Sequence, residues 1–221
     1  MTADPAFEEH ARLIRTATRR PHRVSVPPLS YLMIDGKGDP SVTPDYGAAL
    51  AALFAVSYAA KFRLRAEGVD HKVAPPEALW WAESMSAFTS GTAEDRARWE
   101  WTAMIAQPAA ATPDLLKRAM DQVAAKKKDL VALDRLRLAE LAEGDAVQVL
   151  HVGPWSAEGP VIVALHAYAH DLGLTFDGPD LKHHEIYLSD ARRVPPERWR
   201  TVIRQPARVH VGGGSARARG R

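Results

Sequence analysis

The sequence predicts an α+β fold made of two similar units, each with a strand, a helix and two further strands. Three observations predict it. Apolar residues alternate in several short segments and recur at helical spacing in longer ones. The order strand, helix, strand, strand occurs twice along the chain. The last strands of the units also match in letters, because Trp101-x-x-x-Ile105-x-Gln107-Pro108-Ala109 returns as Trp199-x-x-x-Ile203-x-Gln205-Pro206-Ala207.

The first unit, at about residues 22–110, is predicted from a strand at 30–35, a helix that begins near Thr43, and strands at 78–83 and 98–107. The Thr43 hydroxyl suits the cap of this helix, and Pro44 suits its first position because proline has no N–H to leave unpaired. Gly68 is the expected stop of the helix.

The second unit, at about residues 133–208, is predicted from a strand at 146–152, a helix at 158–172, and strands at 182–189 and 200–205. A helix at 112–128 links the units and again starts with threonine, proline and aspartate. The segment 133–141 fits either period, and we favour a strand because a turn-forming Glu-Gly-Asp sequence follows it.

The ends of the chain are expected to lie outside this domain of residues 21–210. Residues 1–20 are interpreted as a polar arm. Residues 211–221 combine glycines with arginines and lack an apolar pattern, so they predict a disordered tail. We favour a solvated basic tail over a nucleic-acid contact.

Helices are expected on one face of each antiparallel sheet, as in two-layer folds. The other faces would then point at each other or at solvent. A cleft between two packed repeats is a natural place for a ligand.

Composition bounds the function. The chain has 221 residues, of which 46% are hydrophobic and 25% charged, as in globular proteins. A net charge of +2 gives no overall field that would draw nucleic acid or a membrane surface. The absence of cysteine excludes disulfides, thiolate metal sites and cysteine nucleophiles. No secretory signal or membrane-length apolar run is present, so we expect a cytoplasmic protein with no membrane contact.

Four of the six tryptophans lie between residues 80 and 101. Strand alternation places Trp81 with Glu83 on one face and Trp80 on the other, whereas Trp99 and Trp101 share a face. Burial in the core is one explanation for these side chains, and the wall of a ligand pocket is the other.

The strand at 182–189 carries a polar face and an apolar one. His183, Glu185 and Tyr187 share the polar face, whereas His184 shares its face with Ile186. The polar face holds a base, an acid and a phenol, although a solvated strand face would look the same. Because His183 and His184 point in opposite directions, they are not ligands of one metal ion.

No cofactor or metal site is expected. His166 and His170 have a spacing that suits one metal ion, but no third ligand stands near them in a motif. The glycines at 36 and 38 lack the third glycine of a dinucleotide-binding loop, and no Gly-x-Ser-x-Gly sequence occurs.

The chain resembles the GyrI-like small-molecule-binding family, and specifically its stand-alone members. The resemblance covers roughly residues 25–208. It rests on the order and spacing of several stretches: YLMIDGKGDP, AVSYAAKF, ALWWAE, WEWTAMIAQP, VQVLHVGPW and HHEIYLSDARRVPPERW followed by VIRQP.

The resemblance implies two pseudo-twofold-related units with a ligand cleft, and a planar hydrophobic small molecule as the partner. Some stand-alone members are hydrolases that open the cyclopropane ring of DNA-alkylating natural products. Related domains bind multidrug-type compounds without catalysis, and another relative inhibits DNA gyrase. These are the alternatives, with the gyrase role the weaker.

The same resemblance implies the site residues. Glu185 is the expected general base and Tyr187 the expected hydrogen-bond donor to the substrate carbonyl. The residues expected to contact the ligand are Trp80, Trp81, Glu83, Trp99, Trp101, Trp155, Tyr168 and His183. With water as the second substrate, the chain is expected to be a hydrolase that protects the cell from xenobiotics.

Overall fold

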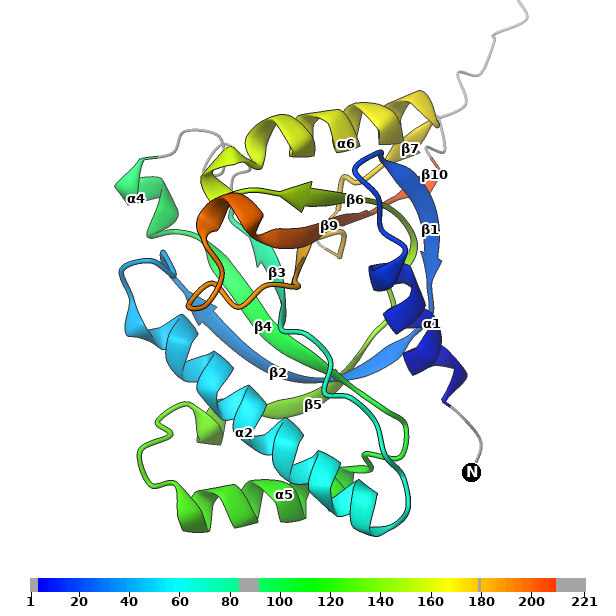
Figure 1. The fold of residues 1–221 in the computed structure, drawn as a ribbon. Coiled ribbons are helices and arrows are strands. Elements are labelled where there is room, and N and C mark those ends of the chain that lie inside the picture. Colours follow the sequence, from blue (N-terminus) through cyan, green and yellow to red (C-terminus); the bar gives the residue numbers. More distant parts are fainter. Residues whose placement is uncertain (1–3, 84–91, 179, 210–221) are drawn as a thin grey trace, which may run out of the picture.

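The computed structural model describes residues 4–83, 92–178 and 180–209, which form one curled antiparallel sheet with helices packed on it (Figure 1). The strand order is β1-β6-β9-β8-β3-β4-β2-β5. The strands are β1 His22–Val26, β2 Leu29–Lys37, β3 Glu77–Trp81, β4 Glu100–Gln107, β5 Arg137–Leu141, β6 Gly144–Val152, β8 His183–Tyr187 and β9 Arg200–Pro206. The helices are α1 Pro5–Arg15, α2 Pro44–Ala66, α4 Ala93–Arg96, α5 Pro113–Lys126 and α6 Gly159–Asp171. A short ribbon pairs β7 Leu174–Thr175 with β10 Arg208–Val209.

The α+β fold with two related units is confirmed. One unit is β2-α2-β3-β4 and the other is β6-α6-β8-β9. Their strands join edge to edge through β3 and β8, which pair antiparallel from Glu77↔Ile186 to Trp80↔His183. The pseudo-twofold axis therefore passes between these two strands. The units meet at the centre of one sheet, and not as two separate sheets that face each other as was expected.

The strand that precedes each unit pairs with the other unit. β1 lies beside β6, and β5 lies beside β2. The ambiguous segment 133–141 is a short 3-10 helix followed by β5, so the preference for a strand holds for residues 137–141. β1 was not predicted because its five residues, HRVSV, carry only two apolar side chains. The exchange of these strands ties the two units together.

Local sequence signals set the helix ends. Thr112 accepts a hydrogen bond from the Leu115 N–H at 3.3 Å and caps α5 as expected. Thr43 precedes α2 but does not cap it, because its hydroxyl donates to the carbonyl of Asp39 instead. Past the end of α2, Gly68 takes a φ of +84°, which favours glycine and turns the chain out of the helix.

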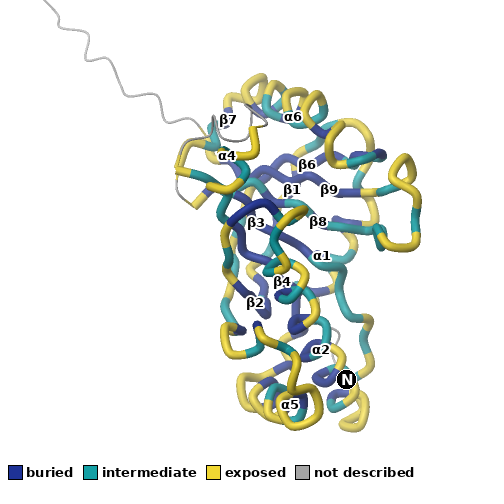
Figure 2. Tube along the Cα trace, turned by 90° about the vertical axis from the view of Figure 1, so that its left-hand side faces the viewer, coloured by how far each residue is buried: buried dark blue, intermediate teal, exposed yellow. Residues whose placement is uncertain are grey.

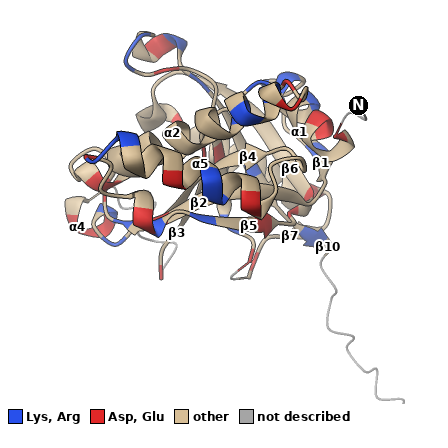
Figure 3. Ribbon diagram, turned by 90° about the horizontal axis from the view of Figure 1, so that it is seen from below, with Lys and Arg blue, Asp and Glu red and all other residues tan. Residues whose placement is uncertain are grey.

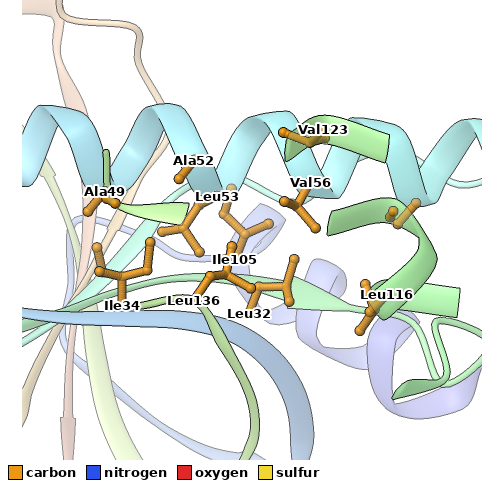
Figure 4. Packing of buried hydrophobic residues seen from close by; sticks show 14 of the residues in the cluster. Leu32, Ile34, Ala49, Ala52, Leu53, Val56, Ile105, Leu116, Val123 and Leu136 are labelled. Carbon is orange, nitrogen blue, oxygen red and sulfur yellow. The ribbon is translucent and has the colours of Figure 1, made fainter. Parts of the chain in front are cut away.

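The main core lies between the sheet and the two helices α2 and α5. Leu32, Ile34 and Ile105 point from β2 and β4 towards Leu53 and Val56 of α2 (Figure 4). All five are fully buried, and each such side chain contributes about 1.5–3 kcal/mol through burial. By length and composition α2 is apolar enough to cross a membrane. Its packing on this core accounts for part of that apolar character, whereas Tyr58 and Phe62 of the same helix are exposed.

α6 covers the same face of the sheet at the other end, as Figure 1 shows. Leu165 and Ala169 pack against Val147, Val149 and Ile203 of β6 and β9. The strands are largely buried, whereas α5 and α6 keep exposed outer sides (Figure 2). We call this side of the sheet the α2–α6 face, and the opposite side the α1 face.

The α1 face is covered by a helix that the sequence analysis interpreted as a polar arm, and that interpretation was wrong. The Asp4 side chain caps α1 by accepting from the Phe7 N–H at 3.1 Å. Phe7 packs among residues of β2, β3 and β4, Leu13 packs on β1 and β6, and Ile14 packs on β8 and β9. One 11-residue helix reaches all these strands because the sheet curls around it.

Charges of both signs share the face of the molecule that Figure 3 shows. In the view of Figure 3, basic and acidic side chains are interspersed along α5. This distribution agrees with the small net charge of +2. The tail expected at residues 211–221 lies outside the described residues.

Candidate functional site

The centre of the sheet positions four predicted site residues on the α2–α6 face. Trp80 comes from β3, and His183, Glu185 and Tyr187 come from β8. Their faces follow from strand alternation, because Glu77, Leu79 and Trp81 pack on the α1 face, as do His184 and Ile186. The sequence placed Glu185 and Tyr187 on one face, and the structure brings them together beside Trp80.

A chain of hydrogen bonds runs through these four side chains. His183 Nε2 lies 3.2 Å from Glu185 Oε1, and the Tyr187 hydroxyl donates to Glu185 Oε2 at 2.7 Å. Trp80 Nε1–H donates to the Tyr187 oxygen at 3.0 Å. Both carboxylate oxygens of Glu185 are therefore held in place, and 14% of its side chain remains exposed.

The Tyr187 phenol stays protonated. Burial raises the pKa of Tyr187 well above its ordinary value, and the negative charge of Glu185 raises it further. The Tyr46 hydroxyl from α2 lies in the same environment, because burial and the Glu185 charge both raise the pKa of Tyr46. Tyr187 is thus a hydrogen-bond donor at neutral pH, not a base.

Aromatic rings surround this chain on both sides of the axis. The Trp80 ring contacts Tyr46 at a centroid distance of 5.6 Å and Trp99 at 6.0 Å. On the other side, Trp155 lies 5.7 Å from Tyr187 and 4.3 Å from Trp199. Trp155 is 43% exposed, which makes its ring an accessible surface at the edge of the site. Tyr46 and Trp199 were missed, because neither stands in the tryptophan-rich stretch or on the glutamate strand.

The two halves of the site correspond through their loops. The Gly38 N–H donates to the carbonyl of Trp99 at 2.7 Å, and the Gly153 N–H donates to that of Trp199 at 3.0 Å. Trp99 is therefore the structural equivalent of Trp199. The letter match of the sequence analysis paired Trp101 with Trp199, which is two positions out of register.

A second acid, Glu158, lies near the glutamate of β8 and was not predicted. It precedes α6 and is only 4% exposed. Burial raises the pKa of Glu158 to about 9, the Glu185 charge adds to the effect, and the Thr201 hydroxyl offsets part of it. Burial therefore favours the neutral, protonated form of Glu158. In the sequence it is one of many glutamates near a helix start, so only its burial distinguishes it.

His166 adds a neutral imidazole from α6. Burial lowers the pKa of His166 to about 4, and the neighbouring His183 lowers it too. Its ring also lies 4.3 Å from Phe176. Among the described residues no group of three or more histidines or carboxylates is arranged to hold a metal ion.

One predicted site residue, Trp81, lies away from the α2–α6 face, and another, Glu83, is exposed beyond the end of its strand. Trp81 is on the α1 face, where its Nε1–H donates to Glu100 at 3.0 Å and the Lys182 ammonium lies 3.3 Å above its ring. Glu83 follows the end of β3 and is exposed. Strand alternation explains why Trp80 lines the site and Trp81 does not.

Trp101 and Tyr168 pack in the core. Trp101 is fully buried against α2, and its ring fills the space above Gly36, where a Cβ atom would come within 2.1 Å of the indole. Glycine is needed at position 36 for this close approach. Tyr168 packs on the cluster under α6 that contains Val147 and Leu165. Ligand contact by these two residues remains a prediction.

A buried ion network lies on the α1 face, behind the site. Glu77 contacts His10 Nε2 at 2.8 Å and His184 Nε2 at 2.9 Å. Glu143 contacts His184 Nδ1 at 2.8 Å and accepts from Arg204 at 3.0 Å. His184 shares this face with Ile186, which packs against Ile14 of α1. The network fastens α1, β3, β8 and β9 together.

Fold and site together define a class: an α+β domain of two pseudo-twofold units, with an aromatic and acidic site where the units meet. The pattern of the GyrI-like small molecule binding domain matches residues 20–208. This chain belongs to that family, and small-molecule binding is the property that the family defines.

Solved structures agree with this assignment. An uncharacterized conserved protein from Listeria innocua is 35% identical with a TM-score of 0.81, and a hydrolase from the same organism is 32% identical with a TM-score of 0.76. Each match covers 91% of this chain and 98% of the other. The C-terminal domain of EcmrR, 10% identical with a TM-score of 0.52, covers 86% of this chain and 98% of its own and shares the fold. Among proteins of curated function, none matches.

Proposed function

We propose that this protein hydrolyses flat hydrophobic molecules of the DNA-alkylating kind, opening a cyclopropane ring that is conjugated to a carbonyl group. The observation that carries the proposal is the Glu185 carboxylate, which His183 and Tyr187 hold from both sides beneath aromatic rings. A general base must be fixed and must lie next to the bound substrate. The hydrolases from Listeria innocua, 32% and 33% identical, support the reaction class.

The aromatic rings would hold the substrate. Trp99 and Trp155 offer indole surfaces on the two sides of the axis, and a planar ligand gains by stacking on such rings. Trp80, only 7% exposed, supports Trp99 from behind. Trp155 is the most exposed of the three and suits the entrance.

Glu185 would then activate a water molecule. It takes a proton from the water as the oxygen attacks the cyclopropane carbon, and the broken carbon–carbon bond sends its electrons towards the carbonyl group. Tyr187 was expected to donate to that carbonyl. Its proton points at Glu185, so Tyr187 acts here as the group that positions the base.

A non-catalytic binder is the second candidate. A carboxylate surrounded by aromatic rings also suits a flat cation, because ring faces and a negative charge both attract it. Binding without turnover would leave the ligand unchanged, which separates the two functions.

The test is incubation with a cyclopropane-bearing alkylating agent in oxygen-18 water, followed by mass spectrometry. We expect a ring-opened product that carries one labelled oxygen, and a loss of at least about tenfold in rate in Glu185→Gln. Glu140→Gln, at an exposed position of β5, is the matched control and should keep the wild-type rate. Quenching of tryptophan fluorescence without any product would establish the binder and overturn the hydrolase.

A further inference from the structure

The buried side chain of Glu158 makes no ion pair with the described residues, and Thr201 is its polar neighbour. A carboxyl group at a helix start commonly caps the helix, but Glu158 makes no such side-chain hydrogen bond to α6. Its Oε1 atom is buried and has no hydrogen-bond partner within the described part of the chain. Burying a polar atom without a partner costs free energy, and such atoms in native proteins often serve function.

The surroundings of Glu158 are those of the candidate site. Thr201 of β9 is its polar neighbour, and Thr201 stands directly opposite Tyr187 in the pairing of β8 with β9. Trp155, one helical turn before Glu158, contacts the Tyr187 ring. The Thr201 Oγ1 atom is also buried without a partner among the described residues. These two polar groups lie beside β8, close enough for the Thr201 hydroxyl to lower the pKa of Glu158, yet neither Glu158 Oε1 nor Thr201 Oγ1 is within hydrogen-bonding distance of a partner among the described residues.

Titratable side chains from three elements face the region around Glu158. β8 contributes Glu185, His183 and Tyr187, α2 contributes Tyr46, and α6 contributes His166. Glu185 is held by two hydrogen-bond donors, whereas Glu158, as far as the described residues go, has neither an ion pair nor a hydrogen bond at Oε1. The two acids therefore sit in opposite environments, one that suits a carboxylate and one that suits a neutral carboxylic acid.

We propose that Glu158 is the proton donor of this site, acting on the carbonyl oxygen of the substrate while Glu185 removes a proton from water. This assignment rests on the proposed hydrolase function. It names the group that the reaction needs once Tyr187 is committed to Glu185.

The step balances. A carbon–oxygen bond forms between water and the cyclopropane carbon, and the ring carbon–carbon bond breaks. Its electron pair moves through the conjugated system to the carbonyl oxygen, which takes the proton of Glu158. Glu185 takes the proton of the attacking water. The product has gained one water, and the two acids have exchanged protonation states, which solvent restores.

The experiment compares wild type, Glu158→Gln and Glu185→Gln with Glu140→Gln as the exposed control. Glutamine keeps the shape of Glu158 but has no proton to transfer. We expect the rate of ring opening to fall roughly 100-fold in Glu158→Gln, as loss of a general acid should give. Binding of the product, followed by tryptophan fluorescence, should change little, which shows that the site still folds.

The pH profile separates a proton donor from a structural residue. In the wild type the rate should fall as pH rises through about 9, where Glu158 loses its proton. His184 also has a pKa raised to about 9, but it lies on the α1 face and is retained in Glu158→Gln. The residual activity of Glu158→Gln should therefore lack the part of the fall in rate at high pH, the basic limb of the profile, that is due to Glu158. Glu158→Asp, which restores an acid, should recover part of the rate.

Each possible result either supports or overturns the role of Glu158 as the proton donor. A rate in Glu158→Gln within about threefold of wild type, or an unchanged basic limb, would overturn Glu158 as the donor while leaving the Glu185 hydrolase intact. Absence of product from the wild type would overturn the proposed function itself, and the donor role with it. A large loss in Glu158→Gln with the limb removed and product binding kept would establish the assignment.

Discussion

The indole N–H of Trp80 donates a hydrogen bond of 3.0 Å to the hydroxyl of Tyr187, and the two residues come from equivalent strands of the two units. The Tyr187 hydroxyl in turn donates a hydrogen bond of 2.7 Å to Glu185. The first unit therefore reaches across the pseudo-twofold axis to orient the acid of the second. The site depends on both units, although its acids lie on one.

Tyr187→Phe should test this chain of two hydrogen bonds from Trp80 through Tyr187 to Glu185. The change removes the acceptor of Trp80 Nε1 and the donor to Glu185 Oε2, and it leaves both without a partner in a largely buried place. We expect a loss of about 1–3 kcal/mol in the free energy of unfolding, measured with urea, and a changed tryptophan emission. Tyr58→Phe, on the exposed side of α2, is the control and should be near neutral. Equal behaviour of the two variants would contradict this chain of hydrogen bonds.

The periodicity of the strands predicted much of the fold and part of the candidate site. The alternation along β8 placed Glu185 and Tyr187 on one face because a strand turns successive side chains to opposite sides. The same rule separated Trp80 from Trp81. The repeat predicted the pairing of two units, since equivalent elements that follow the same order pack in equivalent ways.

Other features were beyond a one-dimensional pattern. α1 presents Phe7, His10 and Ile14 on one side, but the charged residues between them resemble a solvated arm until a curled sheet supplies the surface. Glu158 is recognised only by burial, which long-range packing of α6 on β9 determines. The depth of Trp101 also depends on packing, in this case on the absence of a side chain at Gly36.

Gly36→Ala should displace Trp101. The added methyl group would meet the indole at 2.1 Å, so the ring must move within a tightly packed core. Overpacking of this kind costs about 1–3 kcal/mol, and the midpoint of urea unfolding should fall accordingly. Gly47→Ala in α2 is the matched control, because nothing lies within 4 Å of its added carbon. That variant should be stabilised by up to about 1 kcal/mol through helix propensity. A Gly36→Ala protein as stable as wild type would show that Trp101 has room to move.

Glu143→Gln should show how much the buried ion network contributes to the free energy of unfolding. It removes the negative charge between His184 and Arg204, both fully buried, and leaves their positive charges with less compensation. Breaking a buried ion pair in this way costs about 3–5 kcal/mol. Asp145→Asn is the control, because its pair with Arg23 is exposed and should contribute no more than about 1 kcal/mol. Denaturation by urea compares the two, and similar losses would argue against a structural role for the network.

The stability of the protein should depend on pH in a way that separates the two faces of the sheet. On the α1 face, burial opposes ionisation of Glu143, but His184 and Arg204 lower its pKa to about 2, so its contribution is present above about 4.5 and is lost as pH falls towards 2. Burial opposes charge on His184 too, yet Glu143 and Glu77 raise its pKa to about 9. Its contribution is therefore present below about 6.5 and is lost as pH rises through 9.

The contribution of Glu158 to stability changes with pH in the opposite direction to that of Glu143. Its pKa is raised to about 9 by burial and by the Glu185 charge, so the folded protein holds a proton that the unfolded chain releases above about 4.5. Stability should thus decline from about pH 5 upwards, first through Glu158 alone and then through His184 as well. Thermal unfolding followed by circular dichroism from pH 3 to 10 measures the curve. Glu158→Gln should flatten the decline between about pH 5 and 6.5 and keep the later fall. A decline in that window that persists unchanged in Glu158→Gln would mean that Glu158 is ionised in the folded protein.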